Sequence, residues 1–416
     1  MDLFSAVSAL VGLSALLSYI NHRFVRLPGT IGIVVLTLAL IVVVRLAGSF
    51  STDTARHLVQ INEQIDFSRT LLDIMLGFLL FAAALQVDLE ALKKQFREVL
   101  VLSTVGVVIS TGLIGVGLYW LTQYIGTPVP LIGCLLFGAL ISPTDPVAVG
   151  AVLKQSPIPS RLETIISGES LFNDGVGLVL FVSLQEVANP DVDFFLIDAV
   201  KLFAQEVIGG IGLGLAMGFV AYRLIKASDD FQTVVLLSLA LVMLLSVVAS
   251  SLHVSVPLAE VAAGLLLGRR LPGGQSTDSP KFYLRRFWHL IDELLNTVLF
   301  VMIGLQVMGL PYLSNYTWIA LGATVLVIAS RWLSILLPFL LQFQLAKQPK
   351  GSLRILTWAG LRGGISIALA LSLPDSPYNE LILACCYGVV LFSIIGQGLT
   401  LNRLVTSVAR SQQSAG

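Results

Sequence analysis

The stretches ALISPTDPVAVG, residues 139–150, and AGLRGGISIALA, residues 359–370, decide the fold, because each interrupts an apolar run with residues that break helices. Two prolines flank Thr144 and Asp145 in the first stretch, and two glycines follow Arg362 in the second. Proline removes a backbone donor and clashes with the preceding turn, and paired glycines weaken a helix entropically. The stretches coincide when the chain is shifted by 220 residues, so we predict matched helix breaks in two related halves.

The composition indicates that both stretches lie in a membrane. Of 416 residues, 56% are hydrophobic and only 12% are charged, and long apolar runs recur along the whole chain. The 25 basic and 25 acidic residues cancel, so no basic excess indicates nucleic acid as a partner. Cys134, Cys385 and Cys386 are too few for a disulfide or zinc framework, and we interpret them as packing residues. The sequence thus predicts an all-α polytopic membrane protein.

About thirteen apolar segments are long enough to be transmembrane helices. Their centres lie near Val11, Thr37, Gly77, Ser110, Leu140, Phe172, Gly210, Val242, Ala262, Met302, Ile328, Arg362 and Val390. Successive connections fall on alternate sides, and most lysines and arginines then collect on one side, opposite acidic loops such as EVANPDVD, residues 186–193. We therefore expect the N-terminus outside the cell and the C-terminus in the cytoplasm.

A second match at the same shift supports two inverted six-helix repeats. LLFAAALQV, residues 79–87, falls on LFVMIGLQV, residues 299–307, and the matched spans are separated by an odd number of helices. The halves then run in opposite directions, as in many secondary transporters. In that plan two discontinuous helices cross near the middle of the membrane, where freed carbonyls can bind a cation. Asp145 and Arg362 can neutralise the opposing helix dipoles. The alternative is a pair of kinks that only shape helix packing.

Span six carries polar side chains that a membrane helix does not need for packing. In ISGESLFNDGVGLVLF, residues 166–181, Ser170 and Asp174 lie one turn apart on one face. Glu169 and Asn173 form a neighbouring stripe with the same spacing. Burying such groups costs on the order of several kcal/mol unless each has a partner or a function.

We assign a partner to one of these acids and a function to the other. The intramembrane arginines Arg331 and Arg362 are both candidate partners of Glu169. For Asp174 we predict ion binding, because a buried carboxylate takes up a proton near neutral pH unless a cation replaces that proton. Competition between a proton and a cation for one carboxylate is an exchange mechanism. The alternative is a purely structural acid.

Two other classes of function use similar residues. An intramembrane hydrolase needs a nucleophile with a base, and no histidine accompanies Ser170. A cation channel also uses buried acids, but it does not require inverted repeats with two matched helix breaks. The sequence thus favours a transporter over an enzyme and keeps a channel as the less favoured alternative. Glu260 and Lys201 also lie within spans, and the pattern assigns no role to either.

Four motifs together resemble the monovalent cation/proton antiporter superfamily, in its electroneutral sodium/proton exchanger branch (NhaP-like, related to the animal exchangers). They are TDPVAV (144–149), GESLFND (168–174), SRW (330–332) and GLRGGIS (360–366), and the likeness covers essentially the whole chain. The pair of Asn173 and Asp174 is specific to this branch, since electrogenic relatives have two aspartates there. The resemblance implies a thirteen-helix fold, the sodium/proton antiporter fold, in which a core domain moves against a dimerisation domain.

The resemblance also implies a role for each motif residue. Asp174 is expected to carry the ion and the proton, and the residues expected to line the site with it are Asn173, Ser170, Thr144 and Asp145. Bound Na⁺ is expected at Asp174, Ser170 and Thr144. The family pairs Arg331 with Glu169, which leaves Arg362 to the broken helix twelve.

One position departs from the family. Relatives often have an acid after the LLF of span three, where this chain has Ala82, so a ligand or gate at that position is not carried over.

By the same resemblance, two pairs of segments make up the two domains. Residues 1–90 (spans one to three) and 191–312 (a linker helix and spans seven to ten) are expected to form the dimerisation domain. Residues 91–190 (spans four to six) and 313–405 (spans eleven to thirteen) are expected to form the core transport domain. Residues 406–416 are expected to be a short cytoplasmic tail.

The resulting hypothesis is a secondary transporter that exchanges Na⁺, and also Li⁺, for H⁺ by alternating access with one-for-one stoichiometry. We expect a homodimer in a prokaryotic plasma membrane that uses no cofactor, and its partners are the lipid bilayer, monovalent cations and protons. A K⁺/H⁺ or Ca²⁺/H⁺ antiporter of the same fold is the alternative, since the sequence does not rank the cations.

Overall fold

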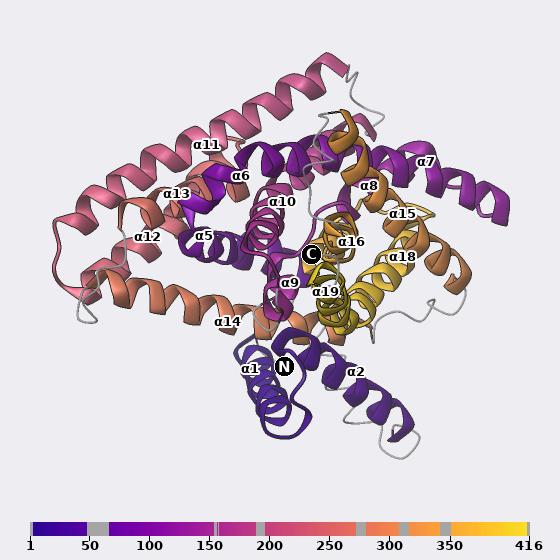
Figure 1. Cartoon of the computed structure of the whole chain (residues 1–416), viewed down its shortest axis with the longest axis horizontal. Coiled ribbons are helices and arrows are strands. Elements are labelled where there is room, and N and C mark those ends of the chain that lie inside the picture. The colour runs from indigo at the N-terminus through magenta and orange to yellow at the C-terminus, as the bar shows by residue number, and fades with distance from the viewer. Residues whose placement is uncertain are drawn as a thin grey trace. The chain divides into compact units, whose positions relative to one another are not determined.

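The computed structural model describes residues 3–47, 66–153, 156, 158–188, 196–271, 280–307, 316–341 and 351–413 (Figure 1). These residues form helices and their connections, and no strand occurs among them. The predicted all-α fold is confirmed.

The α-helices begin and end as follows: α1 (Leu3–Ile20), α2 (Gly29–Ala47), α4 (Phe67–Arg69), α5 (Leu76–Gln86), α6 (Leu89–Val101), α7 (Val107–Ile125), α8 (Leu131–Ile141), α9 (Pro146–Leu153), α10 (Ser160–Ala188), α11 (Leu196–Lys226), α12 (Phe231–Ser251), α13 (Val256–Arg270), α14 (Pro280–Gln306), α15 (Thr317–Leu341), α16 (Ser352–Trp358), α17 (Gly364–Leu371), α18 (Asn379–Leu391) and α19 (Gly398–Gln413). Short π-helical segments interrupt or extend them: η1 (Asn21–Val25), η2 (Thr70–Met75), η3 (Leu102–Gly106) and η6 (Phe392–Gln397).

These helices carry the predicted spans. Within the described residues, 9 helical segments are long and apolar enough to cross a membrane, and two shorter apolar helices lie at Gly29–Val44 and Leu131–Ile141. Every predicted span centre falls on a helix or, for Arg362, in the gap between α16 and α17. The two spans predicted to be discontinuous are divided, one into α8 and α9 and the other into α16 and α17.

The helices form two compact units. Unit 1 comprises Met1–Leu71, Ile109–Glu163 and Asn296–Gly416, and unit 2 comprises Leu72–Val108 and Thr164–Leu295. The units group residues by contact and do not test the division into core and dimerisation domains, which stays a prediction, as does the inverted repeat.

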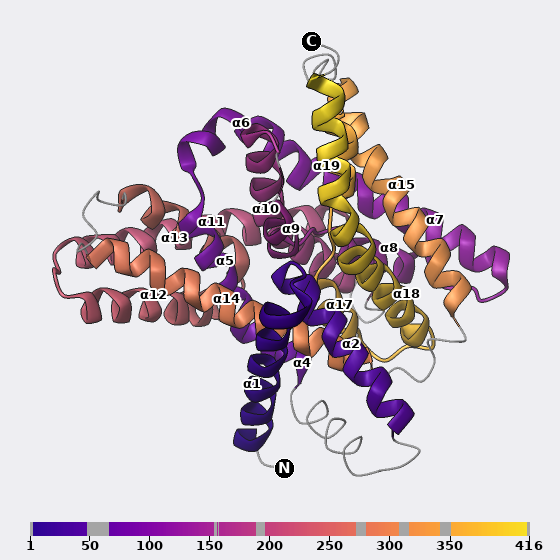
Figure 2. The same cartoon turned by 60° about the horizontal axis from the view of Figure 1, so that its bottom comes forward.

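In unit 2, α13 packs against α5, α11 and α12 (Figure 2). The approach to α11 is so close that a Cβ atom at Gly214 would lie 2.1 Å from the carbonyl oxygen of Ala259. Gly210 and Gly218, one turn to either side of Gly214, meet the next turns of α13 in the same way. Small residues with this spacing let helix backbones touch.

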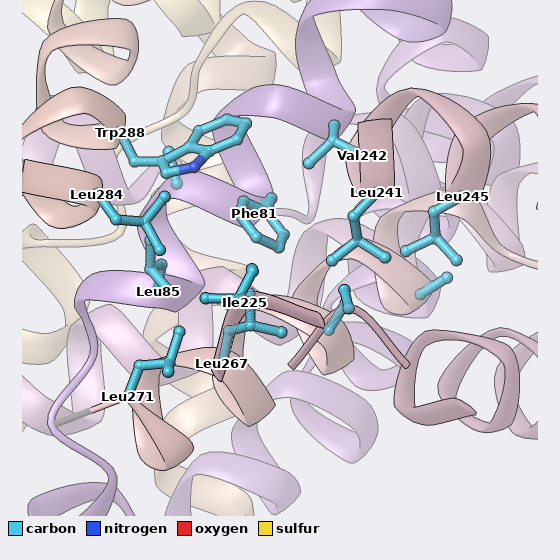
Figure 3. Close-up of a cluster of buried hydrophobic side chains, with 14 of the residues drawn as sticks. Phe81, Leu85, Ile225, Leu241, Val242, Leu245, Leu267, Leu271, Leu284 and Trp288 are labelled. Atoms are coloured by element: carbon cyan, nitrogen blue, oxygen red, sulfur yellow. The ribbon is translucent and has the colours of Figure 1, made fainter. Parts of the chain in front are cut away.

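A hydrophobic cluster fills the space beside α13 in unit 2 (Figure 3). The ring centroids of Phe81 and Trp288 are 4.7 Å apart, and the Trp288 indole N–H donates a hydrogen bond to the Ser238 hydroxyl at 3.0 Å. Ala82, the position where relatives often have an acid, is fully buried in this cluster. Ala82 therefore makes apolar packing contacts in this structure.

In unit 1, α7 lies against α8 just before the first helix break. A Cβ atom at Gly138 would lie 2.4 Å from the carbonyl oxygen of Thr111, so only glycine permits this approach. The Thr111 hydroxyl donates to the Ser142 hydroxyl at 3.2 Å, which ties α7 to the end of α8. The α8 segment packs in turn on α17 and α18.

Local sequence sets where several helices of unit 2 begin. The carboxylate of Asp88 accepts hydrogen bonds from two backbone N–H groups of α6, and that of Asp230 accepts one from Thr233 in α12. Ser255 caps α13, whose first turn carries Pro257. These are ordinary N-terminal signals that satisfy unpaired donors.

Candidate functional site

The two helix breaks meet inside unit 1. The first lies between Ile141, the last residue of α8, and Pro146, the first of α9. The second lies between α16 and α17. The backbone N–H of Asp145 donates to the carbonyl oxygen of Leu361 at 2.7 Å, so the non-helical segments bond directly to each other. The predicted discontinuous helices therefore cross.

Asp145 lies on the positive end of a half-helix. Its Oδ1 accepts a hydrogen bond from the backbone N–H of Val147 at 2.8 Å, which caps α9. An aspartate there interacts favourably with the helix dipole. Gly363 lies so close that a Cβ atom on it would overlap the Asp145 carboxylate. The glycine of the second break is thus required by the acid of the first.

Arg362 lies on the negative end of the facing half-helix. Its Nη1 donates to the carbonyl oxygen of Ser142, at the C-terminal end of α8, and to that of Pro143 at 2.8 Å. The side chain is 1% exposed. Positive charge at this end of α8 offsets the dipole and satisfies carbonyls that the break frees.

Two further residues hold the second break, and the sequence motifs did not identify them. The backbone N–H of Arg362 donates to the Ser393 hydroxyl at 2.8 Å, and this hydroxyl donates to Oε1 of Gln397 at 2.7 Å. Both belong to the π-helical segment η6, which continues α18. A serine and a glutamine four residues apart in an apolar span were the available signal.

The polar residues of span six, three predicted to bind the ion and Glu169 predicted to form an ion pair, lie on the long helix α10. Glu169, Ser170, Asn173 and Asp174 are all buried, and Asp174 is 4% exposed. Two glycines fix the packing of this helix within unit 2. A Cβ atom at Gly168 would meet Leu92 of α6, and one at Gly175 would meet Leu258 of α13. The polar side chains therefore sit at the level where α10 is tightly packed.

The site residues divide between the two units. Thr144, Asp145, Arg331 and Arg362 belong to unit 1, and the four polar residues of α10 belong to unit 2. The structure brings the backbones of Asp145 and Leu361 together across the breaks, and Thr144, which precedes Asp145 in the chain, is 1% exposed. The combination of Thr144 with Ser170 and Asp174 in one Na⁺ site stays a prediction.

Arg331 lies on α15 beside the second break. Its Nη2 donates to the carbonyl oxygen of Leu356 at 3.4 Å, and Gly360 leaves room for the guanidinium. Arg331 and Arg362 line the same small cavity, together with Thr357. Both arginines thus belong to one polar region of unit 1, and the pairing of Glu169 with Arg331 stays a prediction.

Comparison with known proteins agrees with this architecture. Residues 11–407 match the family described as sodium/hydrogen exchanger, transmembrane. The chain is 41% identical to the Na⁺/H⁺ antiporter NhaP of Pseudomonas aeruginosa in an alignment of 417 positions, gaps included, that covers 98% of this chain and 97% of that protein. It is 32% identical to the Na⁺/H⁺ antiporter NhaH of Halobacillus dabanensis over 343 residues, 82% and 83% of the two chains.

A solved structure shares the fold. The sodium proton antiporter MjNhaP1 of Methanocaldococcus jannaschii, determined at pH 8, superposes with a TM-score of 0.76 and covers 98% of this chain and 99% of its own. At 21% sequence identity this likeness concerns the fold alone.

Proposed function

The chain belongs to the sodium/hydrogen exchanger family, and we propose that it exchanges Na⁺ for H⁺ across a membrane by alternating access, with both cations competing for Asp174. The family is one of transporters, and the named relatives support Na⁺/H⁺ exchange. The observation that carries the mechanism is the burial of Asp174 with Ser170 and Asn173 in a membrane helix.

Competition at Asp174 follows from the cost of a buried charge in the membrane. A buried carboxylate is tolerated when a proton or a cation neutralises it, and one carboxylate has room for one of the two. The hydroxyls of Ser170 and Thr144 are the proposed further ligands, since Na⁺ binds oxygen atoms. Each loaded form is neutral at this position, which permits its movement between the two faces.

The helix breaks hold two of the residues that we assign to the site. Asp145 already binds the N-terminal end of α9, and Arg362 binds carbonyls at the C-terminal end of α8. Their charges are committed to helix ends, so we assign both residues to shaping the site and leave ion transfer to Asp174.

A neutral Asn173 beside Asp174 supports one-for-one exchange. With one titrating acid, the site carries one proton in one direction or one monovalent cation in the other, and no net charge moves. A membrane potential of 100 mV would do about 2.3 kcal/mol of work on each net charge. The electroneutral carrier is driven by the two concentration gradients alone.

The wider arrangement is proposed on the same basis. The chain is a multi-pass membrane protein. We assign it to a prokaryotic plasma membrane, with the N-terminus outside, the C-terminus in the cytoplasm and two copies forming a homodimer.

The test of the site is exchange by the purified protein in liposomes after Asp174→Asn. The amide neither takes up nor releases a proton near neutral pH and has no charge, so we expect exchange to be abolished for every cation. The variant should still insert normally into the membrane. Glu163→Gln is the matched control, because Glu163 is an exposed acid on the same helix. Substantial exchange by Asp174→Asn would move the site elsewhere.

The test of stoichiometry is exchange with the membrane potential clamped at values of both signs. Turnover should not change with potential, and Na⁺ addition should give no sustained current. Asn173→Asp introduces a second acid and is expected to make turnover depend on potential. A sustained current from the unmodified protein would contradict the role given to Asn173.

The same liposomes separate the alternatives. Coupled proton movement with K⁺ or Ca²⁺ in place of Na⁺ would identify a K⁺/H⁺ or Ca²⁺/H⁺ antiporter. Cation flux without any counter-proton would identify a channel.

A further inference from the structure

Glu260 is a buried acid that the proposed transport cycle does not use. It lies in α13 of unit 2, and its side chain is 0% exposed. Lys201, the other unassigned charged residue within a predicted span, differs from it. The Lys201 ammonium is exposed and lies 3.4 Å from Asp198. Glu260 therefore requires an explanation of its own.

Helix packing encloses Glu260 in a junction of α5, α12 and α13. Glu260, Gly264 and Gly268 are four residues apart, so they form one stripe along α13. Both glycines press on the backbone of α5, where Cβ atoms would lie 2.8 Å from the carbonyl oxygens of Phe81 and Leu85. One turn closer to the N-terminus of each helix, the same contact between α13 and α5 brings Glu260 to Gly77.

At that turn Glu260 meets a glycine and a serine. A Cβ atom at Gly77 of α5 would lie 3.5 Å from its Oε1. This oxygen accepts a hydrogen bond from the Ser246 hydroxyl of α12 at 3.2 Å. Oε2 is buried and has no hydrogen-bond partner among the described residues. The carboxyl group is thus held by one neutral donor.

The helices around this junction bring no cation to it. Neither α5 nor α12 contains a charged residue. The nearest charged position before α5 is Asp73, which is exposed. Along α11 no charged residue lies between Glu206 and Arg223. Glu206 is itself an acid of α11, and its backbone carbonyl accepts a hydrogen bond from the backbone N–H of Ser255, the residue that caps α13.

The remaining neighbours of α13 also carry charged groups. On α14, which packs against α5 through Trp288, these include Asp292, and His289 lies 3.6 Å from Glu293. Arg269 and Arg270 end α13, more than two turns beyond Glu260, and α6 contributes Glu90 on the side of Arg269. The Arg285 guanidinium donates to the carbonyl oxygen of Gly268, also two turns away. The contact of α13 with α10 is made by Leu258, which points to the opposite side from Glu260.

We propose that Glu260 is a second proton-binding site, separate from Asp174. Glu260 keeps its proton through the transport cycle. When alkaline conditions remove this proton, the packing of α5, α12 and α13 around Glu260 loosens. The neutral acid fits a buried junction that offers one hydroxyl. An ionised carboxylate there would meet no cationic side chain of α5 or α12. The site belongs to one unit and does not depend on the transport role of Asp174.

The direct test is labelling of the purified, intact protein by dicyclohexylcarbodiimide, with the modified peptide identified by mass spectrometry. This apolar reagent reacts with protonated carboxyl groups: the acid proton moves to a carbodiimide nitrogen and the carboxylate oxygen bonds to its central carbon. We expect Glu260 to be labelled at neutral pH with equal yield in the presence and absence of saturating Na⁺. Glu260→Gln should lose this label only.

Three outcomes bear on the proposal. Equal labelling with and without Na⁺ supports it. Protection of Glu260 by Na⁺ would make it a cation site and overturn the proposal. No labelling at Glu260, with normal labelling of other buried acids, would also overturn it. Protection of Asp174 from labelling by Na⁺ tests the proposed transport site. The hypothesis for Asp174 and the hypothesis for Glu260 can therefore fail independently.

A second measurement uses the unfolding temperature as a function of pH. An acid that keeps its proton in the folded state contributes less to stability as pH rises, because the unfolded chain releases that proton first. The unmodified protein should therefore lose about 2 to 4 °C relative to Glu260→Gln between about pH 5 and pH 9. Parallel curves for the two proteins would overturn the proposal. Ser246→Ala is the control for loss of the hydrogen bond alone.

Discussion

In the helix breaks of unit 1, charged side chains lie on the ends of half-helices, with Arg362 buried and Asp145 half-buried. In unit 2, by contrast, the packing of α5, α11 and α13 depends on glycines. Arg362 and Asp145 bind carbonyl and N–H groups that the breaks leave without intrahelical partners. Gly214 and Gly264 instead let intact helices press on neighbouring backbones. Both regions are buried, and their polar requirements differ.

The difference shows what a buried charge needs in a membrane protein. A broken helix exposes backbone dipoles, and a charged side chain that binds them is stabilised by them. An unbroken helix has no such groups to offer, so an acid in its packing surface is accommodated either as a neutral group or beside a cationic side chain. The breaks can therefore hold permanent charges, and the glycine-lined junction cannot.

The largest effect is expected at Glu169 of α10, if an opposite charge balances its buried carboxylate as in the helix breaks. Glu169→Ala or Arg331→Ala should each cost about 3 to 5 kcal/mol, because each leaves the opposite charge buried. Yield and unfolding temperature of the purified variants measure the loss. The double variant should recover part of it, and a double variant no more stable than the worse single one would contradict the pairing.

A similarly large loss of stability is expected when a methyl group is added where α11 and α13 touch through their backbones in unit 2. Gly214→Ala places a methyl group against the Ala259 carbonyl, which cannot move without shifting α13, so we expect a cost of up to about 3 kcal/mol. Gly212→Ala on the same helix is the control, since nothing lies within 4 Å of its added Cβ atom. That change should leave stability equal or raise it. Equal loss in both variants would show that the contact does not hold the unit together.

The breaks should depend on charge rather than on volume. Arg362→Gln keeps a polar side chain but loses the charged donor to the Ser142 and Pro143 carbonyls, and such a bond contributes about 1.5 to 3 kcal/mol. We expect Na⁺/H⁺ exchange in liposomes to fall by at least about tenfold. Exchange at the unmodified rate would mean that the freed carbonyls do not need this arginine.

The two functions of Asp145 can be separated by a pair of substitutions. Asp145→Asn keeps the cap on Val147 and loses the charge, whereas Asp145→Ala loses both, at a cost of about 1 kcal/mol for the cap. We expect both to weaken apparent Na⁺ affinity in exchange assays, and only the alanine variant to lower stability. An alanine variant with normal kinetics would remove Asp145 from the site.

The smallest effect is expected at an exposed cap outside the spans. Hydrogen bonds from the Thr233 hydroxyl and backbone N–H hold the pKa of Asp230 below its ordinary value of 3.8. Its contribution to the first turn of α12 is therefore present above that value and is lost as pH falls through the lowered pKa. Protection of this turn from hydrogen–deuterium exchange, measured relative to the intrinsic rate at each pH, should fall below about pH 4 in the unmodified protein, and protection in Asp230→Asn should not change over that range. Identical pH profiles would show that the cap does not use the charge.

Much of the architecture could be predicted because its determinants are local. Hydropathy placed the spans, and Pro and Gly residues placed the two breaks at 143–146 and 363–364, since both act on the backbone where they stand. The family of the chain also followed from short motifs. The acids of α10 were recognisable because a carboxylate in an apolar run is costly wherever the helix packs.

The partners within the site could not be predicted in the same way. Ser393 and Gln397 hold the backbone of Arg362 from a segment more than thirty residues away, and a small polar pair in a span has no distinct pattern. The contact of Gly363 with the Asp145 carboxylate likewise joins two distant breaks. Such contacts depend on how the helices cross.

The sequence by itself determined which segments enter the membrane, which two are discontinuous and which family the chain resembles, because hydrophobicity, helix breaking and motif chemistry act within a few residues. Only the tertiary structure decided what each buried polar group meets. Glu260 and Asp145 are both acids within spans, yet one faces a glycine and a serine while the other binds a helix end. That difference is set by neighbouring helices, since the groups that surround a carboxyl group decide whether its neutral or its charged form is the more stable one.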